Sequence, residues 1–140
     1  MREKTCFMIK PDGVARGLEN EIFKRVENAG LNVEVRQKMS LTAEQAAELY
    51  KPHLDKPFYP GLIKFITSGA VVACVVSGES AIGRLRALMG ATDPMKAEAG
   101  TIRGDLREEI VLSEYGTIKN LVHGSDSPES AEREIAIFFK

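Results

Sequence analysis

The pattern of hydrophobic and polar positions in the first part of the chain predicts a strand, a helix and a second strand. Residues 5–9 form an apolar run of strand-prone residues that ends at Lys-Pro-Asp-Gly, a turn signal. Residues 31–35 alternate between apolar and polar positions, as a half-buried strand does. Between these two segments, apolar residues recur at the spacing of a helix that ends at Gly30: Leu18, Ile22, Val26 and Ala29.

Two short helices separated by prolines are predicted next. Thr42, followed three residues later by Gln45, is a capping-box pattern that begins a helix extending to about residue 50. Pro52 and Pro57 then interrupt the helical pattern. A second short helix is expected over residues 59–68.

The remainder of the chain alternates between strands and helices. Ser127 suits the N-cap of a final helix, and Pro128 suits its first position. Before this helix we expect a strand at residues 70–76, a helix at 79–89, a loop at 90–107 and a last strand at 118–122.

These elements together predict the fold class. Four strands interleaved with helices indicate an α+β sandwich, in which helices pack on a small sheet. At 140 residues the chain fits one domain, and it contains no internal repeat, low-complexity tract or linker that would divide it. We therefore expect one domain over residues 1–140 with a ferredoxin-like βαββαβ core, a four-stranded antiparallel sheet covered by helices.

Composition and charge exclude several classes of function. The chain has 19 basic and 20 acidic residues without a dense block of either sign, so neither a nucleic acid nor an anionic membrane is expected as its main partner. Cys6 and Cys74 lie in apolar runs as expected of buried thiols, which favours a reducing, cytoplasmic location. No signal peptide and no apolar stretch of roughly 18 residues is present. We expect a soluble protein.

His123 is the strongest candidate for chemistry. It stands at the end of the last apolar strand, in the sequence Asn-Leu-Val-His-Gly-Ser-Asp, and strand ends are where functional sites are often built. The alternative is a histidine that merely finishes a strand, because one residue is a weak motif. Other residues must decide between the two.

Glu134 is the first of these residues. On a helical wheel it projects between Ile137 and Phe138, inside the apolar arc of the final helix. A charged, unpaired carboxylate there would be costly, and His123 is a candidate partner. Such a pair would fix the imidazole tautomer and leave the other ring nitrogen free as a nucleophile. The alternative is that Glu134 reaches solvent at the edge of the helix.

Groups that could bind phosphate occur in several loops. No GxxxxGK[ST] sequence is present, so phosphates would have to be held without a glycine-rich cradle. Phe58, between two prolines, could stack on a base or could simply anchor its loop to the core. Four side chains, each an ordinary surface group when taken alone, could together clamp a polyphosphate: Lys10, Arg86, Thr92 and Arg103.

Asn-Leu-Val-His-Gly-Ser-Asp at residues 120–126 resembles the active-site signature of the nucleoside diphosphate kinase family. Any one such motif would be weak evidence, but seven in order over nearly the whole chain make a chance resemblance negligible. The other six segments that resemble the family, in the same order, are residues 8–17, 56–62, 68–73, 90–94, 100–105 and 127–135.

The resemblance implies a ping-pong reaction. A nucleoside triphosphate would phosphorylate Nδ1 of His123 and leave as the diphosphate, and a second diphosphate would then collect the phosphoryl group. An imidazole suits this role because it is largely neutral at pH 7 and forms a labile P–N bond. Glu134 would hold the His123 ring, either directly or through Ser125.

The resemblance also implies how nucleoside di- and triphosphates bind. Lys10 and Asn120 would reach the ribose, and Phe58 would stack on the base, which tolerates every base because each has a π-face. Mg²⁺ would arrive bound to the nucleotide phosphates, and no dedicated metal site on the protein is expected. A homo-oligomer is expected, with a hexamer favoured. The phosphates would be bound by Lys10, Tyr50, Arg86, Thr92 and Arg103.

The segment before Asn120 departs from the family pattern, and strand geometry adds a requirement for Asn120 and His123. Residues 106–119 form a longer segment than in typical members, so a second contact with the base could come from either Thr117 or Ile118. Strict strand alternation would also place Asn120 and His123 on opposite faces. A bend between them is therefore required if both contact the nucleotide.

Two other functions stay open at this point. One is a catalytically silent nucleotide-binding regulatory protein of the same fold. The other is a metal-binding protein that uses His53 and His123, although their spacing is not that of close metal ligands. His53 is expected to be a surface residue in a turn.

Overall fold

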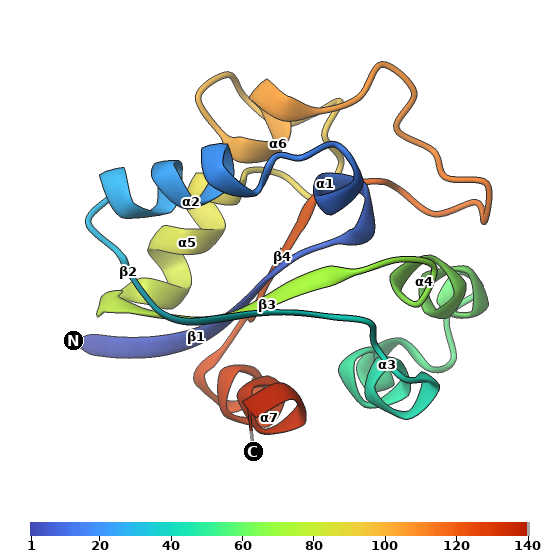
Figure 1. Cartoon of the computed structure of the whole chain (residues 1–140), viewed down its shortest axis with the longest axis horizontal. Coiled ribbons are helices and arrows are strands. Elements are labelled where there is room, and N and C mark those ends of the chain that lie inside the picture. The colour runs from blue at the N-terminus through green and yellow to red at the C-terminus, as the bar shows by residue number, and fades with distance from the viewer. Residues whose placement is uncertain (140) are drawn as a thin grey trace.

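The computed structural model describes residues 1–139, which form a four-stranded sheet with helices on both faces (Figure 1). The strand order across the sheet is β2-β3-β1-β4, and every neighbouring pair is antiparallel. The ferredoxin-like α+β fold that the sequence predicted is confirmed. The strands are β1 (Arg2–Ile9), β2 (Asn32–Met39), β3 (Val71–Glu79) and β4 (Val122–Gly124).

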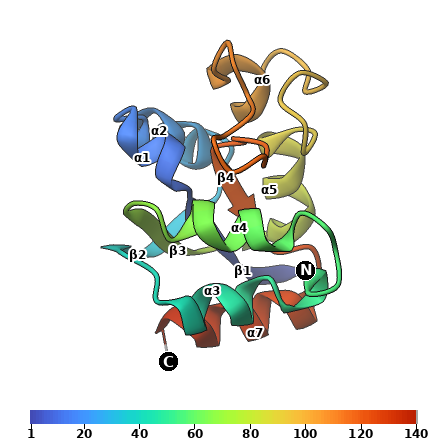
Figure 2. The ribbon, with the colours of Figure 1, turned by 90° about the vertical axis from the view of Figure 1, so that its right-hand side faces the viewer.

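The helices form two layers (Figures 1 and 2). On one face lie α1 (Pro11–Ala15), α2 (Glu19–Asn28), α5 (Ala81–Met89) and α6 (Ile102–Leu106). On the other face lie α3 (Ala43–Leu49), α4 (Tyr59–Ile66) and α7 (Pro128–Phe139). A short 3-10 helix, Lys51–His53, connects α3 to the loop before α4.

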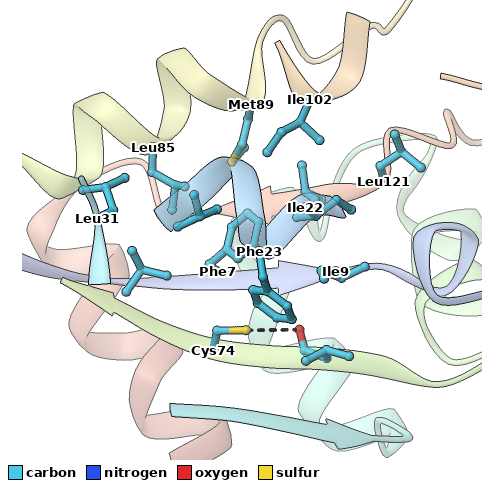
Figure 3. Packing of buried hydrophobic residues seen from close by; sticks show 14 of the residues in the cluster. Phe7, Ile9, Ile22, Phe23, Leu31, Cys74, Leu85, Met89, Ile102 and Leu121 are labelled. Carbon is cyan, nitrogen blue, oxygen red and sulfur yellow. Dashed lines mark hydrogen bonds between the residues drawn. The ribbon is translucent and has the colours of Figure 1, made fainter. Parts of the chain in front are cut away.

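Each face of the sheet has its own hydrophobic core. Along β1, Phe7 and Ile9 point into the first core, under α2 and α5, whereas Cys6 and Met8 point into the second, against α7. Figure 3 shows the first core packed between the sheet and its helices. Because both faces are covered, β3 is buried over almost its whole length, which explains its continuous apolar sequence.

Several predicted elements are confirmed with shifted ends. The helix at residues 42–50 has the expected capping box, because the Thr42 hydroxyl accepts from the Gln45 N–H and the Gln45 side chain accepts from the Thr42 N–H. Ser127 caps α7 by accepting the N–H of Ser130. The first two strands are longer than predicted, since charged residues at their exposed ends obscure the apolar pattern.

Two segments were predicted wrongly as turn or loop. The Lys-Pro-Asp-Gly segment begins the short helix α1, because Pro11 occupies the first helical position, where its fixed φ is already suitable. The segment at 90–107 contains α6, whose five residues are too few to show a helical period. The sequence feature that could have indicated α6 is its N-cap residue Thr101, whose hydroxyl accepts the N–H of Gly104.

The prediction for the last strand was also wrong. β4 covers Val122–Gly124 rather than residues 118–122, so His123 lies inside the strand and not at its end. Upstream of β4, Ile118 pairs with Leu112 in an isolated bridge, and Leu121 adopts a left-handed φ of 71°. The apolar residues before His123 are therefore not one continuous strand.

Cys6 and Cys74 are both free and buried, as predicted. They lie on neighbouring strands but point to opposite faces of the sheet, because Cys74 lies opposite Phe7 and not opposite Cys6. Burial raises the pKa of the Cys74 thiol to about 12. Among the helices of residues 1–139, none combines the length and apolar character that a membrane crossing requires.

Candidate active site

His123 and Glu134 form a hydrogen-bonded pair between β4 and α7. His123 Nε2 lies 2.7 Å from Glu134 Oε1, and the Glu134 side chain is almost fully buried, with 4% of the residue exposed. Glu134 therefore does not reach solvent at the helix edge. Because the carboxylate oxygen can only accept, Nε2 carries the proton and Nδ1 carries the lone pair.

Ser125 holds Glu134 in place through hydrogen bonds to the carboxylate and to β1. Its hydroxyl donates to Glu134 Oε1 at 2.8 Å and accepts the backbone N–H of Cys6 at 3.3 Å. One carboxylate oxygen thus accepts from both His123 and Ser125. The arrangement fixes Glu134 relative to β1 and leaves the His123 ring little freedom to turn.

Lys10 follows β1 and is buried, with only 6% of the residue exposed. Its Nζ donates to Asn120 Oδ1 at 2.8 Å. Burial first, and the nearby Arg103 guanidinium second, lower the pKa of Lys10 from 10.5 to about 8, while Asp12 acts in the opposite direction. A lysine in this environment favours a bound anion, because a nearby negative charge would raise its pKa and stabilise its charged form.

Arg103 comes from α6 and is held by three backbone carbonyls. Nε donates to the carbonyl of Asn120 at 3.0 Å, Nη1 to that of Gly90 at 3.0 Å and Nη2 to that of Val122 at 2.7 Å. These bonds use three of the five guanidinium N–H groups and leave one on each Nη for a ligand. Burial and the proximity of Arg86 lower the pKa of Arg103 to about 10, so it stays charged at neutral pH.

Asn120 faces the same cavity as His123 in spite of their spacing. Its amide accepts from Lys10 and donates from Nδ2 to the carbonyl of Thr92 at 3.1 Å. The left-handed φ of Leu121 supplies the bend that strand alternation required. The expectation of a bend between Asn120 and His123 is therefore confirmed.

These side chains line one cavity of about 380 Å³ between the α3–α4 segment, α5 and β4. Nine of the predicted site residues line it, whereas Ser125 lies behind Glu134. Phe58, 47% exposed, is at the N-cap of α4, and Tyr50 is buried at the end of α3. The full set of predicted residues around the cavity is Lys10, Tyr50, Phe58, Arg86, Thr92, Arg103, Asn120, His123 and Glu134.

A second hollow, of about 530 Å³, lies between the start of β1 and α7. It is shallower and contains none of the predicted site residues. Glu3 and Lys4 line it together with apolar residues of α7, including Phe139. The cavity around His123 is the one in which a nucleophile and cations converge, so it is the candidate active site.

Sequence inspection missed several residues of the cavity wall. His53 is exposed, as predicted, yet it lies on the rim, with its ring centroid 5.7 Å from that of Phe58. The other missed residues were not singled out by their chemistry, although several lie in segments that resemble the family, and only the folded chain brings them to the cavity. They are Leu49, Pro52, Leu62, Met89, Gly124, Asp126, Ser130 and Arg133. Thr117 and Ile118 do not line the cavity, so the structure brings neither to the predicted site.

Carboxylates near the cavity are few and already engaged. Glu134 accepts from His123 and Ser125, and a hydrogen bond from Ser130 is the largest cause of the lowered pKa of Asp126. Within residues 1–139, no three His, Cys, Asp or Glu side chains are grouped so that they could hold a metal ion. The cationic side chains that line the cavity, Lys10, Arg86 and Arg103, suit an anion.

A sequence model of the family described as "Nucleoside diphosphate kinase" matches residues 3–140 of the chain. A protein of that name from Rubrobacter xylanophilus is 52% identical over 137 residues, which cover 98% of each chain. Another from Moorella thermoacetica is 51% identical, over 98% of this chain and 94% of that protein.

Solved structures agree with these matches. A nucleoside diphosphate kinase from Halobacterium salinarum, in complex with CDP, superposes with a TM-score of 0.89 at 46% identity, over 100% of this chain and 89% of the other. A second, from Borrelia burgdorferi, is a transition state mimic with bound vanadate and ADP. It superposes with a TM-score of 0.91 at 34% identity, over 99% of this chain and 88% of the other.

Proposed function

The chain belongs to the nucleoside diphosphate kinase family, and on that premise we propose that His123 carries the phosphoryl group that the enzyme passes from a nucleoside triphosphate to a nucleoside diphosphate. The observation that supports this role is the bond from His123 Nε2 to Glu134. It leaves Nδ1, on the ring that borders the cavity, as the nitrogen that attacks phosphorus.

The transfer proceeds in two mirrored steps. In the first, the Nδ1 lone pair attacks the γ-phosphorus, the Nδ1–P bond forms, and the bond to the bridging oxygen of the diphosphate breaks. His123 becomes an imidazolium, and Glu134 stabilises its charge through the Nε2–H without taking the proton. After the first diphosphate leaves, a terminal oxygen of a second diphosphate attacks the same phosphorus, the Nδ1–P bond breaks, and the ring becomes neutral again as the new triphosphate forms. No separate base is needed, because Nδ1 carries no proton at the start.

The cationic side chains bind the phosphates. Arg103 offers its two free N–H groups and Lys10 offers its ammonium, in a cavity that Arg86 also lines. Arg86 is itself directed by a bond from Nη1 to the carbonyl of Gly124 at 3.3 Å. Charge develops on the phosphate oxygens during transfer, so cations fixed in advance favour the transition state. The hydroxyls of Thr92 and Tyr50 complete this set.

Ribose and base would lie toward the open side of the cavity. Lys10 and Asn120, already bonded to each other, present their polar ends to the ribose hydroxyls. Phe58 is exposed and offers a face on which any base can stack. The relatives bound to CDP and to ADP carry a pyrimidine and a purine, which supports a site that tolerates both.

Mg²⁺ would enter with the nucleotide as part of the substrate. The donors of the cavity suit this arrangement, because its cations face phosphates and Glu134 is engaged with His123. The ion would therefore be held mainly through phosphate oxygens, where it neutralises charge.

We also propose a homo-oligomer, with a hexamer favoured, in a cytoplasmic setting. β2 lies at an edge of the sheet and leaves backbone groups available for pairing with another chain. The free thiols of Cys6 and Cys74 fit a reducing compartment.

Steady-state kinetics test the proposed function. With ATP varied at several fixed concentrations of GDP in the presence of Mg²⁺, double-reciprocal plots of the rate of GTP formation should be parallel lines, as a phosphoenzyme intermediate requires. Intersecting lines would show direct transfer between two bound nucleotides and would contradict the role of His123 as carrier.

A further inference from the structure

A strained turn lies immediately before β4. The N–H of Val122 donates to the carbonyl of Asn120 at 2.7 Å, so three residues close a turn with Leu121 at its centre. Leu121 has a φ of 71°, which is the sign that disfavours a residue with a β-carbon. Three-residue turns with this φ are rare and strained. Such strain persists only where the surroundings hold it, and it is concentrated at functional sites.

The turn reverses the alternation of side chains along the chain. Leu121 and Val122 are consecutive, yet both point into the first core, where Leu121 is labelled in Figure 3. An extended chain would place Asn120 on the same face as Val122. The turn instead directs Asn120 to the cavity that His123 also lines.

Asp12, in α1, binds the centre of this turn. Its Oδ2 accepts the N–H of Leu121 at 3.0 Å, and the N–H of Lys10 donates to the carbonyl of Leu121 at 2.8 Å. Both backbone groups of the strained residue are thereby bonded. Asp12 is the side chain that satisfies its N–H, and Leu121 is fully buried, so bulk solvent does not reach this N–H in the folded protein.

The burial of Asp12 is difficult to explain by packing alone. Only 7% of the residue is exposed, and Oδ1 has no hydrogen-bond partner within residues 1–139. Burial raises the pKa of Asp12, and Lys10 and the Leu121 N–H oppose this rise without cancelling it. A carboxylate kept in such a place at an electrostatic cost points to a specific task for its one bonded oxygen.

We propose that Asp12 is a positioning residue for phosphoryl transfer, because its carboxylate holds the strained turn at Leu121 that sets Asn120 and His123 on one cavity. The inference rests on the proposed role of His123. The negative charge of the Asp12 carboxylate has a second, smaller effect, because it offsets part of the repulsion between Lys10 and Arg103.

Two substitutions separate the acceptor from the charge. Asp12→Asn keeps a carbonyl oxygen for the Leu121 N–H, whereas Asp12→Ala leaves that N–H buried without a partner. Glu3→Ala is the matched control, because Glu3 Oε1 also accepts one backbone N–H, that of Ile82 at 3.1 Å, but lies outside the active cavity. Circular dichroism establishes that each variant folds.

Catalysis and backbone protection should change together. We expect kcat to fall roughly tenfold to a hundredfold in Asp12→Ala, because small displacements of reacting groups have effects of this order. In Asp12→Asn, kcat should stay within about threefold of the wild-type value, and Glu3→Ala should leave kcat unchanged. By NMR hydrogen exchange, the Leu121 amide should exchange at least about tenfold faster in Asp12→Ala, whereas the Cys74 amide of β3 should not.

Wild-type kcat together with unchanged Leu121 exchange in Asp12→Ala would overturn the proposal. So would an Asp12→Asn protein as impaired as Asp12→Ala, since charge and not the acceptor would then matter. If Asp12→Ala does not fold, Asp12→Asn decides, and Leu121 exchange about tenfold above wild type together with wild-type kcat in that variant would refute the positioning role. The exchange measurement does not depend on His123 chemistry, so a failure of the proposed function is distinguishable from a failure of this inference.

Discussion

Glu134 and Lys10 show how single side chains in the cavity are controlled by their surroundings. The buried carboxylate of Glu134 accepts from His123 and Ser125, which sets the tautomer of the ring. The buried ammonium of Lys10 is bonded to Asn120 and repelled by Arg103. Each of these environments has a consequence that a substitution or a change of pH should reveal.

Removing the Glu134 carboxylate should slow transfer through His123. We expect Glu134→Ala to lower kcat by roughly a hundredfold, because the ring loses both its orientation and the partner of its cationic form. Glu134→Gln should lose less, since its amide oxygen can still accept the Nε2–H. Rapid-quench measurement of His123 phosphorylation checks this, and a Glu134→Ala protein that transfers at the wild-type rate would undo the tautomer argument.

Nucleotide affinity should decrease as the pH rises through the lowered pKa of Lys10. Above about pH 8 the unliganded enzyme loses the Lys10 charge, so KM should increase by up to about tenfold per pH unit. The stability of the fold should change in the opposite direction, because it should increase as the pH rises. The unfolded chain binds more protons at this residue between about pH 8 and 10.5, so the free energy of unfolding should increase across that window.

The control for this pH dependence is Lys10→Met. Its KM should be higher than that of wild type at pH 7 and should change little between pH 7 and 9. A wild-type KM that stays flat over the same range would show that Lys10 does not titrate near pH 8 or does not bind phosphate.

At the scale of elements, the segment at 107–119 and α4 depend on a close approach at Gly61. A β-carbon at Gly61 would lie 2.6 Å from the carbonyl oxygen of Tyr115 and 2.9 Å from Cγ2 of Thr117. Residues 111–119 form a narrow loop, in which the Lys119 N–H donates to the carbonyl of Val111. This loop packs against the helix that carries Phe58 and Leu62 to the cavity.

Two glycine-to-alanine substitutions test this contact at equivalent places. Gly61 and Gly83 are each the third residue of a helix, α4 and α5, but nothing lies within 4 Å of a β-carbon at Gly83. Gly83→Ala should stabilise the protein by about 0.5–1 kcal/mol through helix propensity. Gly61→Ala should destabilise it by about 1–2 kcal/mol through overpacking. Urea denaturation at one protein concentration compares them, and equal stabilisation by both would refute the close contact.

Elements with a strong period, or with a cap in front of a longer helix, were predictable from the sequence, and those that are short or defined by tertiary contacts were not. The capping box at Thr42, the N-cap at Ser127 and the apolar β3 were recognised because their signals are local. The short helices α1 and α6 were missed because five residues carry too little pattern. β4 was misplaced because the strained turn at Leu121 is held by Asp12 and Arg103, which are distant in sequence.

At the scale of the whole molecule, the site is assembled from segments spread along nearly the entire chain. Lys10 follows β1, Phe58 precedes α4, Arg103 lies in α6 and Glu134 in α7. Motif order along the sequence predicted that these residues converge, and the structure brings them together. The residues that complete the wall, such as His53, could not be assigned from spacing, because only the fold places them at the rim.

The assembly is a prediction at this same scale. We expect the protein in solution to have about six times the mass of one 15.4 kDa chain. Light scattering coupled to size-exclusion chromatography measures this mass directly. A monomer at micromolar concentration would contradict the proposed oligomer and would leave the β2 edge without its expected partner.

The central claim is that His123 carries the phosphoryl group, and covalent labelling tests it most directly. The protein has two histidines, and both line the cavity, so His53→Ala is the matched control for His123→Ala. After incubation with γ-labelled ATP and Mg²⁺, wild type and His53→Ala should hold an acid-labile, alkali-stable label that added GDP discharges as GTP, and His123→Ala should hold none. A label that persists in His123→Ala, or that is lost only in His53→Ala, would contradict the account.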